Sequence, residues 1–379
     1  MNAVDQLVEI SREVGRDPEW VLAGGGNTSV KENGLLYIKA SGTSLAATTP
    51  QSLVKMEMGK LGAIWLADYP TDTREREARA LADLMAARAP GEENKRPSVE
   101  TLMHALLTYR FVVHTHPSLI NGVTCGNEGE AVANRLFGGR ALWIPTVNPG
   151  YVLAQTLKNL VDRFTEANGA APQIILLQNH GLVVAADSAI EIRSLQAEVA
   201  ELVRHELKRE PDLTPVSIDS RRVSSAEAAV RAVTKSQAVR FLVNAEIARA
   251  VADRASLARV MSAYSPDHIV YAGVEPLFLP APANGGSPAE SDIAAAISDY
   301  RNRLSADPKV FALQRLGIVG VGSNEAAADN AAQLFLDALK VSIYADSFGG
   351  YRFLPADQVR FIRGWEVEQY RSRLGTETR

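Results

Sequence analysis

The chain has 379 residues, of which 46% are hydrophobic and 22% are charged, and this ordinary globular composition excludes a disordered, collagen-like or coiled-coil chain. With 40 Lys and Arg against 44 Asp and Glu, the formal net charge is −4, which gives no electrostatic case for binding nucleic acid or an anionic membrane. Cys125 is the single cysteine, the N-terminus lacks signal-peptide features, and no segment approaches the roughly 20 apolar residues of a membrane span. These features predict a cytoplasmic protein with about two domains.

The first half of the chain alternates predicted helices and strands. Apolar spacing predicts an amphipathic helix at residues 3–15, and the glycine triplet 24–26 predicts a turn, since glycine is unfavourable inside a helix. Pro97 and Ser98 open a helix over 99–107, with Ser98 as the expected N-cap. The other predicted helices are 74–88, 152–167 and 188–209, and the predicted strands are 35–39, 111–115, 141–144, 174–177 and 182–185.

Prolines near residues 211–220 mark the expected domain boundary, which divides the chain into domains 1–215 and 216–379. Strands interleaved with helices indicate an α/β layered fold, and closely spaced strand pairs favour a mostly antiparallel sheet. In the second half, the predicted helices are 224–236, 237–254, 288–304, 324–345 and 355–373, and the predicted strands are 268–273, 277–279, 310–313 and 316–321.

Two nine-residue segments, 177–185 and 313–321, share Leu, Gln, Gly and Val at four positions with an offset of 136. Each reads as a strand, a tight turn and a strand, followed by an Ala-rich helix. One interpretation is that domain 216–379 is a shortened, degenerate copy of the first; the other is convergent composition. In the second segment Leu316 stands where the first has His180, so such a copy would lack the imidazole.

Three of the six histidines are candidate metal ligands. His114 and His116 end a predicted strand, where side chains at i and i+2 point to the same face. His180, in a turn before Gly181, is the natural third ligand of a His₃ site with one open position, as in catalytic zinc centres. An H-x-H pattern alone is a weak signal, and the other three histidines have ordinary structural interpretations.

Glu100 follows Pro97 and Ser98 in the first turn of a predicted helix. Carboxylates favour helix N-termini on electrostatic grounds, so a structural interpretation is open. The functional interpretation is a general base whose pKa is adjusted by a metal and a desolvated cleft. Three turns, at residues 26–29, 41–43 and 97–98, offer backbone N–H groups and hydroxyls that could bind an anion.

Together these segments resemble the class II aldolase/adducin family. The motifs that carry the resemblance occur in the family's order: GGGNTSVK (24–31), KASGTSL (39–45), RPSVETLMH (96–104), VHTHP (113–117) and NHGL (179–182). The second half, including SFGGYRFL (347–354) and WEVEQYR (365–371), looks like the long branch of the family. That branch includes the aldolase part of bifunctional rhamnulose-1-phosphate aldolase/alcohol dehydrogenases; since no dehydrogenase segment follows here, the second activity is not expected.

The resemblance implies an α/β/α layered fold around a mostly antiparallel central sheet. It also implies Zn²⁺, or another divalent cation, on His114, His116 and His180, with Glu100 as the catalytic acid/base. The positions that correspond to the family's phosphate pocket are Asn27, Ser29, Ser41, Gly42 and Ser98. Val99 departs from the family pattern, because small-sugar aldolases often have a second serine there.

The implied function is a zinc-dependent sugar-phosphate aldolase of the rhamnulose-1-phosphate type. It would cleave a ketose 1-phosphate reversibly to dihydroxyacetone phosphate and an aldehyde, through a metal-stabilised enediolate. Two alternatives stay open: an epimerase or dehydratase on the same scaffold, and a non-catalytic adducin-like scaffold, although that branch would be expected to lose the histidines. The expected partner is a small-molecule sugar phosphate, and the expected assembly is a homo-oligomer.

Overall fold

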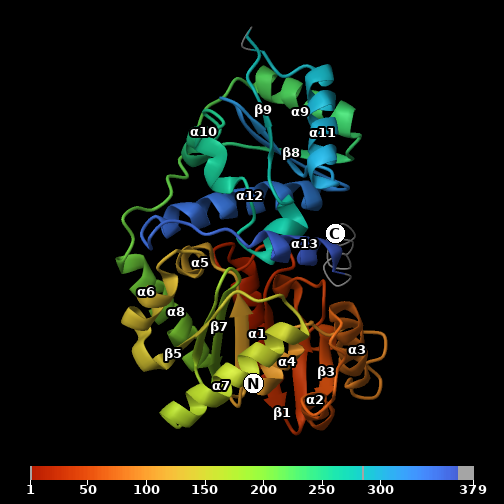
Figure 1. The fold of residues 1–379 in the computed structure, drawn as a ribbon, viewed down its shortest axis with the longest axis vertical. Coiled ribbons are helices and arrows are strands. Elements are labelled where there is room, and N and C mark those ends of the chain that lie inside the picture. Colours follow the sequence, from red (N-terminus) through yellow and green to blue (C-terminus); the bar gives the residue numbers. More distant parts are fainter. Residues whose placement is uncertain (1, 284–285, 366–379) are drawn as a thin grey trace. The chain divides into compact units, whose positions relative to one another are not determined.

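The structure is a computed structural model that describes residues 2–283 and 286–365 (Figure 1). The chain forms two compact units: the first holds residues up to 124 together with 128–206, and the second holds 125–127 together with the residues from 207 onward. The functional division into a catalytic domain 1–215 and a domain 216–379 stays a prediction. In the described part of the chain, no helix combines the length and apolar character that crossing a bilayer requires.

The first unit is built on a sheet with the strand order β3-β2-β1-β4-β7-β6-β5. Its strands are β1 (Asn27–Glu32), β2 (Leu35–Lys39), β3 (Leu53–Glu57), β4 (Phe111–Thr115), β5 (Ala141–Ile144), β6 (Ile174–Leu177) and β7 (Gly181–Ala186). Neighbouring strands are antiparallel apart from β5 and β6, which run parallel. The prediction of a mostly antiparallel central sheet is therefore confirmed.

Helices cover both faces of this sheet. They are α1 (Ala3–Arg16), α2 (Met58–Ile64), α3 (Thr73–Ala86), α4 (Thr101–Leu106), α5 (Ser118–Thr124), α6 (Gly129–Phe137), α7 (Tyr151–Asn168) and α8 (Ala189–His205). Apolar side chains of α2, α3, α4 and α7 pack on one face, against alternate residues of the strands. Helices α1, α5 and α8 pack against β1, β4 and β7. These layers confirm the α/β/α fold class.

The second unit has a smaller sheet with the order β8-β11-β10-β9. Its strands are β8 (Ala238–Leu242), β9 (Leu277–Leu279), β10 (Val310–Leu313) and β11 (Gly317–Gly322), and its helices are α9 (Ser220–Thr234), α10 (Ala245–Ala250), α11 (Glu290–Leu304), α12 (Glu325–Ala345) and α13 (Ala356–Gly364). Side chains from α9 and α11 form a core on one face of the sheet, and α12 packs against β8 and β11 (Figure 1). This unit is the second, smaller α/β region that the sequence predicts.

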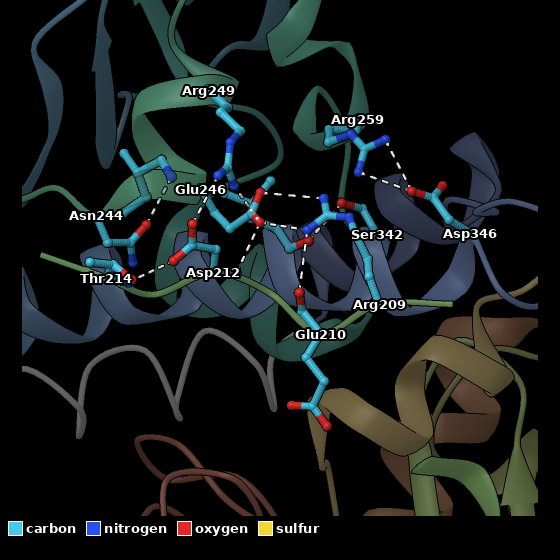
Figure 2. A network of polar contacts seen from close by, with 12 residues as sticks. Arg209, Glu210, Asp212, Thr214, Asn244, Glu246, Arg249, Arg259, Ser342 and Asp346 are labelled. Atoms are coloured by element: carbon cyan, nitrogen blue, oxygen red, sulfur yellow. Dashed lines mark hydrogen bonds and ion pairs between the residues drawn. The ribbon is translucent and has the colours of Figure 1, made fainter. Parts of the chain in front are cut away.

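A polar network joins the start of the second unit to α10 (Figure 2). The side chain of Glu246 is buried and accepts hydrogen bonds from the guanidinium groups of Arg209, at 2.5 Å, and Arg249, at 2.8 Å. The backbone N–H of Asp212 donates to the same carboxylate at 2.9 Å. A buried carboxylate is costly unless it is paired, and here two arginines and a backbone donor compensate it. The network thereby fixes residues 209–212 to the helix.

Two predicted elements of the second unit are wrong. The predicted helix 237–254 is a strand, β8, followed by the short helix α10, because Asn244 interrupts the segment and its side chain caps α10 by accepting from the N–H of Ile247. The predicted strand 268–273 is a π-helical turn over 268–272. In this turn His268 contacts nearby Ser265 through one ring nitrogen and, through the other, Asp337 of α12, a tertiary contact that the local pattern does not indicate. The part of the predicted helix 355–373 beyond residue 365 lies outside the described residues.

Candidate metal centre and its acidic neighbour

Strand β4 presents two of the three predicted ligands. His114 and Thr115 pair with Val183 and Leu182 of β7, and His116 follows directly after the strand. The His114 ring is fully buried, and its Nδ1 lies 2.9 Å from the carbonyl oxygen of Leu182. Because a carbonyl only accepts, Nδ1 donates this hydrogen bond, and Nε2 is the nitrogen that lies near the other two rings.

The third imidazole is placed by a tight turn between β6 and β7. Asn179 has a left-handed backbone with φ 56°, its N–H donates to the carbonyl of Thr124, and its side-chain oxygen accepts from the Thr146 hydroxyl. The N–H of His180 donates to the carbonyl of Leu177, which closes the turn. Asparagine tolerates this backbone region better than most residues, so the turn directs His180 toward β4 at little cost.

Gly181 lets the turn approach β4 closely. A Cβ at this position would lie 2.8 Å from Cδ2 of His116 and would also clash with the carbonyl oxygen of Thr115. Real Cβ atoms do not come this near backbone atoms, so a glycine is required where the two ligand-bearing segments meet. The sequence NHG thus supplies a left-handed residue, a candidate ligand and a close backbone approach in succession.

The three rings converge on one point. Nε2 of His114 is 2.9 Å from Nε2 of His116 and 3.4 Å from Nε2 of His180, and the possible ligand atoms all lie within 4.8 Å of one another. Among residues 2–283 and 286–365, this is the one group of three or more His, Cys, Asp or Glu side chains with metal-ligand spacing. The donor set fits a divalent cation, because three imidazoles converge and the Leu182 carbonyl orients the ring of His114 through its other nitrogen.

Glu100 lies beside the three rings. Its Oε1 is 3.2 Å from Nε2 of His180 and 3.4 Å from Nε2 of His114, and its Oε2 accepts a short hydrogen bond from the side-chain amide of Asn27. Burial opposes ionisation of this carboxyl, but the imidazoles of His114 and His180 outweigh burial and hold its pKa well below the usual value. The sequence prediction places Glu100 in the first helical turn with Ser98 as N-cap; in the structure α4 begins at Thr101 and Glu100 itself is the N-cap residue.

Ser98 and Asn27 hold this carboxylate in place. The Ser98 hydroxyl accepts from the backbone N–H of Glu100 and from the side-chain amide of Asn27, both at 3.2 Å. The carbonyl oxygen of the Asn27 side chain is buried and has no hydrogen-bond partner. A buried polar atom without a partner is unfavourable, which is consistent with a site that completes its hydrogen bonds when a ligand binds.

The other predicted phosphate-site residues fall into two groups. Ser41 and Gly42 are partly exposed, and the N–H of Ser41 donates to the carbonyl of Arg96 at 2.8 Å, which brings the turn at 41–43 to the segment at 97–98. Ser29 is fully buried, and its hydroxyl lies 2.7 Å from Nδ1 of His104. A phosphate ligand needs a group that the anion can reach, so this contact does not support Ser29 in that role, which stays a prediction.

His104 and Lys39 lie within two of the motifs and make contacts that the motifs themselves do not predict. His104 is fully buried, and burial, assisted by the neighbouring His114, holds its pKa well below the usual value. Lys39 is also buried, and its ammonium donates to the carbonyls of Gly24, at 2.9 Å, and Gly26, at 2.8 Å. Lys39 therefore fixes the glycine loop that leads into Asn27. The contact of His104 with Ser29 and the contacts of Lys39 with the glycine loop join separate segments, and the sequence alone does not reveal them.

The fold and the site define a class of α/β/α protein with a His₃ cluster beside a buried acid. Residues 5–207 match the family model "Class II Aldolase and Adducin N-terminal domain", and residues 217–371 match "Aldolase class II, second domain". The chain belongs to the class II aldolase and adducin family.

The matches to individual relatives cover different shares of this chain and of each relative. The uncharacterized oxidoreductase YuxG of Bacillus subtilis (strain 168) is 24% identical over 419 residues, covering 98% of this chain and 58% of the relative. The chain thus spans less than two thirds of the length of that curated relative. The N-terminal class II aldolase domain of a conserved protein from Thermoplasma acidophilum is 26% identical with a TM-score of 0.45, covering 54% of this chain and 93% of that one. L-fuculose-1-phosphate aldolase from Thermus thermophilus is 19% identical with a TM-score of 0.33, and the match covers 54% of this chain and 94% of that aldolase.

Proposed function

We propose that this protein is a zinc-dependent aldolase that cleaves a ketose 1-phosphate, of the rhamnulose-1-phosphate type, to dihydroxyacetone phosphate and an aldehyde. The observation that carries the proposal is the convergence of three imidazoles with the Glu100 carboxylate, whose Oε1 lies within 3.4 Å of two of them. A non-catalytic scaffold would have no need of this donor set. Family membership supports the same class of chemistry.

His114, His116 and His180 would hold the cation, with one coordination position left for substrate. When bound, a divalent cation supplies Lewis acidity toward a carbonyl oxygen and charge stabilisation of an enediolate. Glu100 is the group that takes the proton from the carbon beside the carbonyl, or returns it, as the C–C bond is broken or formed. Its low pKa keeps it ionised, which is the protonation state that a general base requires.

Asn27 and Ser98 have two tasks in this proposal. They orient Glu100 through the hydrogen bonds already described, and the Ser98 hydroxyl, with Ser41 and the backbone around Gly42, would bind the substrate phosphate. Anchoring the phosphate fixes the distance from the far end of the sugar to the acid/base, which lowers the entropic cost of reaching the reactive geometry. We further propose a homo-oligomer in the cytoplasm, with a small-molecule sugar phosphate as the partner.

The deciding experiment is a panel of ketose 1-phosphates assayed for dihydroxyacetone phosphate release, with zinc present and with zinc chelated. Metal-dependent release from at least one sugar is expected. If the sugar is epimerised or dehydrated instead, without triose release, the aldolase assignment is wrong and the metal site still stands. If purified protein neither contains nor binds a divalent cation, the scaffold alternative replaces both.

A further inference from the structure

The sheet of the second unit repeats part of the first. Strands β4-β7-β6-β5 of the first sheet and β8-β11-β10-β9 of the second have the same order and the same directions, with one parallel pair, β5–β6 or β9–β10, at the end. The helices also correspond: α7 and α11 precede the hairpins, and α8 and α12 follow them. Convergent composition would not reproduce strand order, direction and helix placement together.

The two hairpin turns agree in detail. Asn179 and Arg315, which lie 136 positions apart, both have a left-handed backbone, with φ 56° and 59°. The residue before each is a glutamine whose N–H donates, at 2.9 Å in both cases, to the last residue of the parallel strand: Gln178 to Ile144 and Gln314 to Leu279. The N-caps of α8 and α12 keep the same 136-residue offset.

The segment before the hairpin also aligns without a gap, now with an offset of 127. β4 starts at Phe111 and β8 at Ala238, and the registers with β7 and β11 place Phe241 where the first unit has His114. The acid of the first unit keeps a counterpart, because Glu227 precedes Phe241 by the same interval that separates Glu100 from His114. The Oε1 of Glu227 accepts from the N–H of Phe241 at 3.1 Å, so this carboxylate still lies beside the former ligand position.

All three ligand positions are apolar in the second unit. Phe241 stands for His114, Val243 for His116 and Leu316 for His180. Leu316 is buried in the core that Phe241 packs against. The close approach is preserved as well: a Cβ on Gly317, the counterpart of Gly181, would lie 2.7 Å from the Phe241 ring.

We infer that the second unit is a degenerate copy of the metal-bearing part of the first, and that it retains the backbone of a second three-histidine centre whose ligands have been replaced by Phe241, Val243 and Leu316. The copy keeps the strand register, the left-handed turn residue, the glycine and the acid, and it differs where a cation would be held. The inference depends on the proposed function in one respect only, namely that the three-histidine centre binds a divalent cation.

The test restores the histidines as F241H/V243H/L316H in the full chain, in two backgrounds: wild type, and a chain with His114, His116 and His180 changed to alanine. Zinc per chain is measured after dialysis, and Co²⁺ binding is followed by its visible absorption. One additional equivalent of metal is expected in both backgrounds. The matched control is F241H/V243H/R315H, which has the same histidine content with the third ring one residue away and is expected to gain none.

The alanine background separates this inference from the function proposed above, because any metal bound in that background is held by the restored centre alone. A folded triple variant that gains no metal would overturn the inference. If the triple variant does not fold, the reverse exchange decides: H114F/H116V/H180L grafts the apolar set of the copy into the first unit. If the backbones are equivalent, this variant keeps the far-UV circular dichroism of the wild type and binds no metal; an unfolded first unit would contradict the equivalence.

Discussion

Oε1 of Glu100 lies 3.2 Å from Nε2 of His180, so the proposed acid/base and a proposed metal ligand are in contact. Glu100→Gln preserves the size of the side chain but removes its ability to take a proton. We expect this variant to bind zinc as the wild type does and to lose roughly 10²–10⁴-fold in kcat, the usual contribution of a general acid–base. Zinc content and steady-state turnover measure the two effects, with the exposed Glu201→Gln as control. Undiminished turnover would remove Glu100 from the mechanism.

His180→Ala should weaken metal binding far more than His205→Ala. His180 faces the other two rings, whereas His205 has a side chain that is 76% exposed near the end of α8. Removing a residue that only orients a metal ligand typically lowers metal affinity roughly 10- to 100-fold. Removing a ligand itself should lower the affinity at least as much. Competition titration with a zinc chelator measures both variants. If the two retain zinc equally, His180 is not the third ligand.

Gly181→Ala should damage the metal centre through the backbone. The added methyl would meet His116 and the carbonyl of Thr115, so β4 and the turn must move apart. We expect a loss of about 1–3 kcal/mol in stability, typical of overpacking, together with weaker zinc binding. Gly62→Ala is the matched control, because nothing lies within 4 Å of a Cβ there. That change, at an exposed position of α2, should be neutral or stabilising by up to about 1 kcal/mol. Equal thermal midpoints for the two variants would refute the close approach.

The stability of the first unit should rise with pH above neutrality because of Lys31. Burial lowers the pKa of this ammonium from 10.5 to about 7, against a smaller opposing effect of Asp187. Between these two values the unfolded chain binds the proton and the folded chain does not, so stability increases with pH across that window. Lys31→Met should flatten the rise in thermal midpoint between pH 7 and pH 9. Lys60→Met, at a half-exposed side chain, should leave the slope unchanged; a Lys31→Met slope equal to that of the wild type would contradict the assignment.

Much of the scaffold around the metal centre could be predicted from local sequence. Residues 111–115, 141–144 and 174–177 form the strands that their apolar, β-branched runs predict. Elements whose local pattern is ambiguous were not predictable. The strand at 53–57 and the helix at 58–64 have no clear period, and Val-rich 237–243 reads as part of a helix until Asn244 is seen to cap the next one.

Individual residues of the site divide in the same way. The i, i+2 spacing of His114 and His116 is a local signal, and it predicts their shared face directly. The contacts of Ser29 with His104 and of Lys39 with the glycine loop depend on how β1, β2 and α4 pack, which no local pattern specifies. The position of Glu100 was predictable, but its exact place at the helix start was not, because Ser98 contacts Asn27 and the Glu100 backbone instead of capping the helix.

The hydrogen bond from Nδ1 of His114 to the carbonyl of Leu182 has a consequence for how the protein matures. His114 and His116 leave the ribosome before His180 and its neighbouring strand, so until His180 emerges an ion meets at most two of the three rings. The complete set of proposed ligands therefore exists only after α7, β6 and β7 have been made and β7 has docked beside β4. Binding of a cation by all three rings would then mark completion of the central sheet.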